Sequence, residues 1–187
     1  MRSTRQVSIR PLRILRRGFL LLALLAPQAF GEEYLSTDQF LQQVFGNTVP
    51  AREKMWVSEE QRDVARNTIG LGRPPIRVHY WREGKRSAWI LKEIGKEKPI
   101  TIGVGIYDGQ VETVRILAFR ESRGWEVKYP YFTEQFSGAS TDDKNKLDRR
   151  IDGITGATLS VNAVQKVVRW AVYLDRGLEG TVTADAS

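Results

Sequence analysis

Two consecutive hairpin patterns in the middle of the chain constrain its fold more than any other feature. Residues 100–107 and 110–119 are both rich in apolar and β-branched residues, and Asp108-Gly109 stands between them. An Asp-Gly pair between two such runs is a strong signal for a two-residue β-turn. Residues 76–81 and 87–91 form a similar pair of runs. The sequence therefore predicts an antiparallel β-sheet at the centre of an α+β fold, with helices packed on it.

Three helices are predicted around this sheet. Ser36 is a good N-cap for a short helix that stops at Gly46, and residues 58–68 begin with the pattern of a capping box and end before Gly70. We expect these two helices to form a cover on the N-terminal side. A long C-terminal helix is predicted over residues 159–174. Its apolar stripe has helical spacing and consists of Val161, Val164, Val168 and Val172, widened by Val167 and Ala171.

The first 31 residues have the composition of a secretory signal peptide. Six arginines and no acidic residue lie there, an apolar run covers residues 19–26, and residues 27–31 include small residues at plausible cleavage positions. Eight apolar residues are too few for a spanning helix, which needs about 20, although a retained anchor is the alternative. Arg16-Arg17 also fits a twin-arginine signal, so the export route stays open. The predicted location of the mature protein is the periplasm.

Charge and composition exclude several functions. The formal net charge is +7, and removal of the six N-terminal arginines leaves +1, so the basic character does not support nucleic-acid binding. The chain has no cysteine and one histidine, His79. Disulfides, iron–sulfur clusters and thiolate metal sites are therefore excluded, and a histidine metal site is not expected. No nucleophile–base pair or acid pair stands out as catalytic.

Residues 152–160 read Asp-Gly-Ile-Thr-Gly-Ala-Thr-Leu-Ser and lead directly into the predicted C-terminal helix. A helix N-terminus offers unpaired N–H groups and the positive end of the helix dipole, which suits a phosphate. Gly153, Gly156 and Ala157 leave room for a bulky ligand close to the backbone. Thr158 supplies a hydroxyl at the place where the phosphate would lie. The alternative is an ordinary helix entry.

This segment resembles the D-G-[IV]-[ST]-G-A-[TS] signature of FMN-binding domains in bacterial respiratory flavoproteins. That family includes the C subunit of the Na⁺-translocating NADH:quinone reductase and the G subunit of the RNF complex. The resemblance implies that a flavin transferase joins FMN through its phosphate to Thr158. It also implies that Asp152 is needed for attachment and that Gly153, Thr155, Gly156 and Ala157 line the cofactor. The likeness covers about residues 100–174 and is strongest at 152–160.

A second stretch resembles the same family only in part. Family members carry an E-T-P-G-x-G loop along the isoalloxazine, and residues 121–126 read Glu-Ser-Arg-Gly-Trp-Glu here. Glu121 and Gly124 match by position. Trp125 replaces a small residue and is predicted either to stack on the flavin or to lie in the core, and Arg123 either to stabilise the anionic reduced ring or to be a surface residue. Gly103 and Gly105 inside a predicted strand indicate close packing against a helix, a bulge or the flavin.

The chain is thus predicted to comprise a signal peptide at 1–31, one FMN-binding domain at 32–180 with its core at 76–176, and a disordered tail at 181–187. We expect an exported flavoprotein that passes electrons between a donor and an acceptor. Its expected partners are a flavin transferase and a redox protein such as a membrane electron-transfer protein, and no nucleic acid. A small periplasmic flavin reductase and a non-redox phosphate-binding module are the alternatives. The charged loop at 92–99 is predicted to be solvated, or to dock a redox partner.

Overall fold

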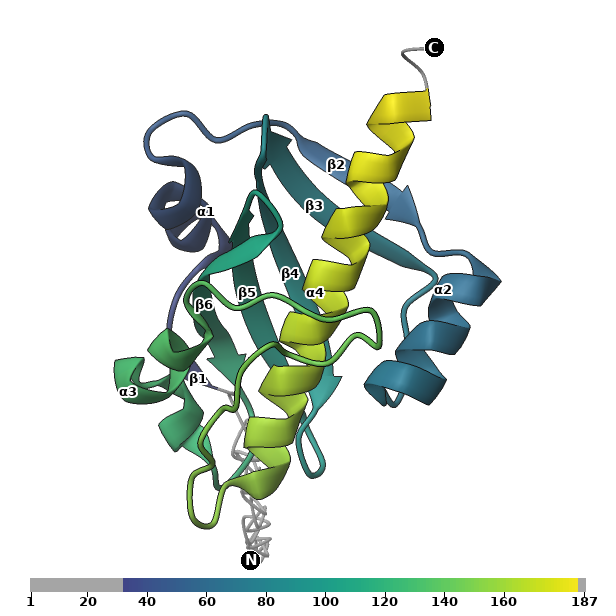
Figure 1. The fold of residues 1–187 in the computed structure, drawn as a ribbon. Helices are drawn as coiled ribbons and strands as arrows, with labels where there is room; N and C mark the ends of the chain where they lie inside the picture. Colours follow the sequence, from purple (N-terminus) through teal and green to yellow (C-terminus); the bar gives the residue numbers. More distant parts are fainter. Residues whose placement is uncertain (1–31, 185–187) are drawn as a thin grey trace, which may run out of the picture.

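A six-stranded antiparallel sheet forms the centre of the molecule, as the hairpin patterns predict. The computed structural model describes residues 32–184, so the predicted signal peptide lies outside the described residues. The spatial order of the strands is β1-β6-β5-β4-β3-β2. Their bounds are β1 (Glu32–Glu33), β2 (Arg52–Trp56), β3 (Arg77–Glu83), β4 (Arg86–Ile94), β5 (Pro99–Tyr107) and β6 (Gln110–Phe119). The α+β fold class is confirmed (Figure 1).

The two outer strands were not predicted from the sequence. Strand β1 contributes only two residues, and Glu32 and Glu33 pair with Phe119 and Ala118 of β6. Strand β2 pairs with β3 along its length, but its sequence is polar and its residues are mostly exposed. A short polar edge strand shows no hydrophobic alternation, and charged side chains on an edge discourage pairing with other chains.

Helices α1 and α4 cover opposite faces of the sheet. Helix α1 (Thr37–Phe45) begins at the Ser36 capping box and ends at Gly46, as expected. Its buried Phe40, Leu41 and Val44 pack with Trp81, Ala88 and Leu117 in a small cluster separate from the main core. The predicted joint cover of two N-terminal helices is therefore wrong, because the second helix joins the α4 side of the sheet.

The two glycines inside β5 are explained by α1. A Cβ at Gly103 would lie 2.7 Å from Cζ of Phe40, and a Cβ at Gly105 would lie 3.1 Å from Val44. Neighbouring β5 residues Ile102 and Val104 point to the other face and belong to the main core. The close approach predicted at these glycines is thus to a crossing helix.

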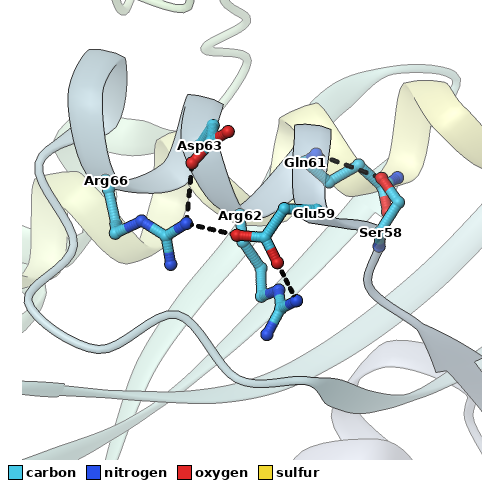
Figure 2. Close-up of polar contacts among 6 residues, drawn as sticks. All are labelled: Ser58, Glu59, Gln61, Arg62, Asp63 and Arg66. Carbon is cyan, nitrogen blue, oxygen red and sulfur yellow. Dashed lines mark hydrogen bonds and ion pairs between the residues drawn. The ribbon is translucent and has the colours of Figure 1, made fainter.

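The second predicted helix is an α-helix that continues as a π-helix. Helix α2 (Glu59–Asp63) begins at a Ser58 capping box, and η1 (Val64–Ile69) ends at Gly70, which has a φ of +86°. Figure 2 shows the outer face of this segment. Arg66 donates to Glu59 and Asp63 at 2.6 Å each, and Arg62 pairs with Glu59. The inner face buries Ala65 and Ile69.

Helix α4 (Thr158–Ala184) crosses the face of the sheet opposite α1 (Figure 1). The valine stripe predicted from the sequence is buried, together with Trp170, Ala171 and Leu174, against the main core. The helix is longer than the predicted 159–174. It extends over residues 181–184 of the predicted disordered tail, and residues 185–187 lie outside the described part. In the part of the chain that the structure describes, no helix combines the length and apolar character needed to cross a membrane.

Between β6 and α4 the chain forms three short helices and a long loop. The helices are η2 (Trp125–Lys128), α3 (Pro130–Thr133) and η3 (Glu134–Phe136). Phe132 and Phe136 are fully buried, and their rings meet edge to face at 5.5 Å. The loop then runs across α4 and returns to the end of the molecule where α4 begins (Figure 1). This return places residues 152–158 beside the chain that leaves β6.

Candidate functional site

A pocket of about 290 Å³ lies at the N-terminus of α4. Three segments far apart in the sequence line it. They are the first turn of α4 with the residues just before it, the turn between β4 and β5, and the loop after β6. The lining residues are Lys96, Arg123, Gly156, Ala157, Thr158, Leu159 and Ser160. The pocket therefore forms at the motif predicted from the sequence.

A tight turn delivers the chain into α4. The Ala157 N–H donates to the Ile154 carbonyl at 3.0 Å, and Gly156 has a φ of +81°. A glycine of positive φ at the third position is the signature of a type II turn, which explains this glycine of the motif. Ala157 is buried, whereas Thr158 is exposed. The turn thus fixes the backbone and leaves the Thr158 side chain accessible.

Contacts with the preceding helices hold the motif in place. The Asp152 N–H donates to Oε1 of Gln135 at 2.7 Å. The Arg149 guanidinium donates to the carbonyls of Ser137 and Gly138 at 2.8 and 2.7 Å. Ile151 is buried in the main core. The segment that leads to the turn is therefore anchored before it reaches the pocket.

Gly124 makes the close contact that brings the loop after β6 against α4. A Cβ at Gly124 would lie 2.4 Å from Oγ of Ser160 and 3.5 Å from Cβ of Ala157, and the φ of Gly124 is +85°. Both the space and the backbone conformation require glycine. Gly124 is thus part of the predicted site as a packing residue under the pocket.

Glu121 ties the same loop to the turn between β4 and β5. Its Oε1 accepts hydrogen bonds from the backbone N–H groups of Lys96, Glu97 and Lys98 at 2.5, 2.7 and 2.8 Å. A carboxylate that accepts several N–H donors is well stabilised. From the sequence, Glu121 was predicted to belong to the loop that lies along the flavin. In the structure its carboxylate positions the neighbouring turn, which carries Lys96 to the pocket.

The electrostatic character of the pocket is positive. The first N–H groups of a helix have no partner within the helix, and the helix dipole adds a partial positive charge there. The first bond that closes onto α4 is donated by Val161 to the Ala157 carbonyl at 2.9 Å. Lys96 and Arg123 add two formal charges from opposite loops. The arrangement can hold an anionic group next to the Thr158 hydroxyl.

Trp125 lies outside the residues that line this pocket. Trp125 is 41% exposed, and its ring meets that of Tyr129 edge to face at 5.6 Å. The Lys128 ammonium lies 5.3 Å from the Trp125 ring and 3.9 Å from the Tyr34 ring. Burial, followed by the nearby Glu32 carboxylate, raises the pKa of Tyr34 to about 12. Trp125 thus belongs to an aromatic cluster beside the pocket, and the core alternative for it is wrong.

Three other predicted residues stand away from the pocket lining. Asp152 and Thr155 are exposed in the loop and turn before α4, and the Asp152 carboxylate lies 3.8 Å from Nε of Arg150. A Cβ at Gly153 would meet no atom within 4 Å, so the fold itself does not require glycine there. Within residues 32–184, no group of three or more His, Asp or Glu side chains is placed to hold a metal.

Three residues that line the pocket were missed as site residues: Lys96, Leu159 and Ser160. Lys96 lies in the charged loop at 92–99, whose composition is that of a solvated segment, and only the fold brings it to Thr158. Ser160 ends the motif and is buried beneath the loop after β6. The motif itself was the available signal for Ser160, whereas no pattern in the sequence distinguished Lys96 from Lys92 or Lys98.

Helix N–H groups, two cations and an exposed hydroxyl together give this pocket of an α+β domain the chemistry that a phosphate requires. The model of the family described as "FMN-binding domain" matches residues 95–173. This match covers β5, β6, the motif and most of α4, as well as every residue that lines the pocket. Residues 95–173 are therefore similar to an FMN-binding domain, which supports flavin binding by this protein. A comparison with curated proteins found no match.

Proposed function

We propose that this chain is an exported flavoprotein that carries FMN covalently on Thr158 and transfers electrons in a periplasmic or membrane-associated redox chain. The observation that carries the proposal is the position of the Thr158 hydroxyl. It is exposed in a positively charged pocket at the start of α4. FMN bears a phosphate, and the helix N-terminus with Lys96 and Arg123 fits that group.

The residues present suit attachment better than reversible capture alone. A phosphate held by the first N–H groups of α4 would have the Thr158 oxygen as its nearest hydroxyl. Attachment forms a bond between this oxygen and phosphorus and breaks the bond between that phosphorus and the leaving group of the flavin donor. The leaving group departs with its own oxygen and takes up the hydroxyl proton. The net gain is FMN less one water. A flavin transferase is the proposed partner that supplies the donor.

Electron transfer is the proposed role because the cofactor supplies the chemistry and the domain supplies its position. A bound flavin accepts one or two electrons. The order of basic, apolar and small residues at 1–31 supports export, where a covalent bond would prevent loss of the cofactor. The redox partner is proposed to meet the exposed side of the pocket.

Intact mass spectrometry of the full chain, co-expressed with a flavin transferase, tests this proposal. Wild type is expected to gain the mass of FMN less water on the Thr158 peptide. Thr158→Val removes the hydroxyl with little change in shape and is expected to abolish the gain, whereas Thr158→Ser retains a hydroxyl and serves as the control. Covalent flavin on Thr158→Val would contradict the site. A wild-type protein without flavin would favour the non-redox phosphate-binding module.

Turnover separates the electron carrier from the reductase alternative. The loaded protein is expected to exchange electrons in single turnovers with artificial carriers and to show no sustained reduction of soluble acceptors by nicotinamide cofactors. Multiple turnovers without a partner protein would instead support a flavin reductase.

A further inference from the structure

We propose that Lys96 and Arg123 form a two-sided cationic clamp that makes this site selective for a phosphorylated flavin over riboflavin. The inference deepens the proposed function and rests on flavin binding at Thr158. It assigns phosphate recognition to two side chains on separate loops, and it gives Glu121 the role of a positioning residue for one of them.

Lys96 and Arg123 line the same pocket, so both could contact one ligand. Lys96 and Arg123 are 27 positions apart in the sequence, and both line the pocket that contains Thr158 and the first turn of α4. Thr158, Leu159 and Ser160 at the start of the helix line this pocket, and the N–H groups of a first helical turn have no partner within the helix. An anion in the pocket would therefore meet N–H donors from the helix and a cation on each of two loops.

Nearby carboxylates do not neutralise the positive charges of Lys96 and Arg123 in the pocket. Glu97 lies 3.5 Å from the Lys96 ammonium, but this exposed pair is weak because both side chains are about 70% exposed, at 71% and 67%. One oxygen of Glu121 accepts three backbone N–H groups of the turn, and Glu121 is not among the residues that line the pocket. No carboxylate is among the residues that line the pocket.

Rigid loops make the clamp specific. Gly124 fixes the loop of Arg123 against Ser160 of α4, and the Glu121 carboxylate in that same loop fixes the turn of Lys96. The two cations are thus carried by segments that are tied to each other and to the helix. Lys98 and Arg120 belong to the same two segments but do not line the pocket, which makes them matched controls.

An NMR titration of the isotope-labelled full chain, made without the transferase, tests the inference. FMN, riboflavin and inorganic phosphate are titrated separately while the amide signals of residues 156–160 are followed. For wild type we expect these signals to shift with FMN and with phosphate, and FMN to bind at least tenfold more tightly than riboflavin. The double variant Lys96→Met/Arg123→Gln is expected to lose about tenfold in the ratio of FMN to riboflavin affinity. Lys98→Met/Arg120→Gln is expected to keep the ratio.

The outcomes separate this inference from the proposed function. An unchanged affinity ratio in Lys96→Met/Arg123→Gln, with Thr158 still loaded by the transferase, would overturn the clamp and leave the proposed function in place. A wild type that shows no shift with FMN or phosphate would also overturn the clamp. If the wild type also fails to load FMN covalently, in addition to showing no NMR shift, the proposed function is overturned as well. Equal losses in the two double variants would indicate a general charge effect and would overturn the specific assignment.

Discussion

Glu121 connects two loops of the site through one carboxylate oxygen. Because this oxygen accepts the N–H groups of Lys96, Glu97 and Lys98, its removal leaves three donors without their partner. We expect Glu121→Ala to lower the free energy of unfolding by about 1–3 kcal/mol. Hydrogen exchange is expected to become faster at these three amides before it changes in β4 or β5. Glu97→Ala is the control, and unchanged protection in Glu121→Ala would disprove the role of the carboxylate.

Gly124 is predicted to tolerate no side chain while Ser160 is present. A Cβ there would lie 2.4 Å from the Ser160 hydroxyl, and the left-handed backbone adds strain for any other residue. We expect Gly124→Ala to cost about 2–3 kcal/mol of stability. The same change in a Ser160→Ala background is expected to cost at least about 0.5 kcal/mol less, because the hydroxyl contact is gone. Equal losses in both backgrounds, measured by urea unfolding, would show that backbone strain alone decides the outcome.

At this scale the sequence predicted the motif well and the loops poorly. Gly156 and Ala157 were predictable because a turn before a helix has strong local requirements. The contacts of Lys96 and Glu121 could not be predicted, because they depend on how two loops 25 positions apart in the sequence pack against each other. Local patterns carry no information on such pairings.

The packing of α1 on the sheet gives a prediction for a whole element. A Cβ at Gly103 would approach Phe40 and Leu117 to 2.7 and 2.8 Å, so α1 must move outward to accommodate it. We expect Gly103→Ala to destabilise the protein by about 1–3 kcal/mol. Covalent loading of the folded protein is expected to stay unchanged, because α1 and the pocket lie on opposite sides of the sheet.

Urea unfolding and intact mass of the same sample test this separation. Gly153→Ala is the control for stability alone, because a methyl group there meets no atom within 4 Å. It is expected to change stability by less than about 0.5 kcal/mol. Loss of covalent flavin in folded Gly103→Ala would mean that the face covered by α1 also serves the cofactor.

The elements with strong local patterns were predicted with nearly their observed bounds. Strands β3 to β6 carry β-branched runs with clear turns, and α1 and α2 begin at capping residues. Strand β2 was missed because its charged sequence has no buried face. That omission also produced the error in the placement of α2, since the strand carries the chain to the other side of the sheet.

The stability of the whole molecule is expected to fall at high pH. Burial and the Glu53 carboxylate, which accepts a hydrogen bond from the phenol at 2.7 Å, raise the pKa of Tyr80 to about 12. The folded state therefore favours the neutral phenol. This contribution is complete below the ordinary tyrosine pKa of about 10 and is lost as the pH rises toward 12.

Urea unfolding between pH 9 and pH 11.5 measures this effect. We expect the stability of wild type to decline over this range, and its advantage over Tyr80→Phe to shrink in parallel, because phenylalanine has no proton to release. The decline that remains in Tyr80→Phe is expected to include Tyr34, whose pKa is raised in the same direction. A constant difference between the two proteins would exclude Tyr80 as a contributor.

The pairing of Glu32 and Glu33 with the last residues of β6 fixes how far the start of β1 lies from the pocket. This distance affects how often a tethered partner would meet the pocket. The loop that carries Glu121 and Arg123 begins directly after Phe119, the residue opposite Glu32. Any protein or surface joined to the chain just before Glu32 is therefore held within a short tether of the pocket. Such a tether raises the local concentration of the pocket at that attachment, so electron exchange there would not depend on diffusion through the surrounding volume. A partner fused after α4 would begin at the far end of the molecule and would have no such advantage.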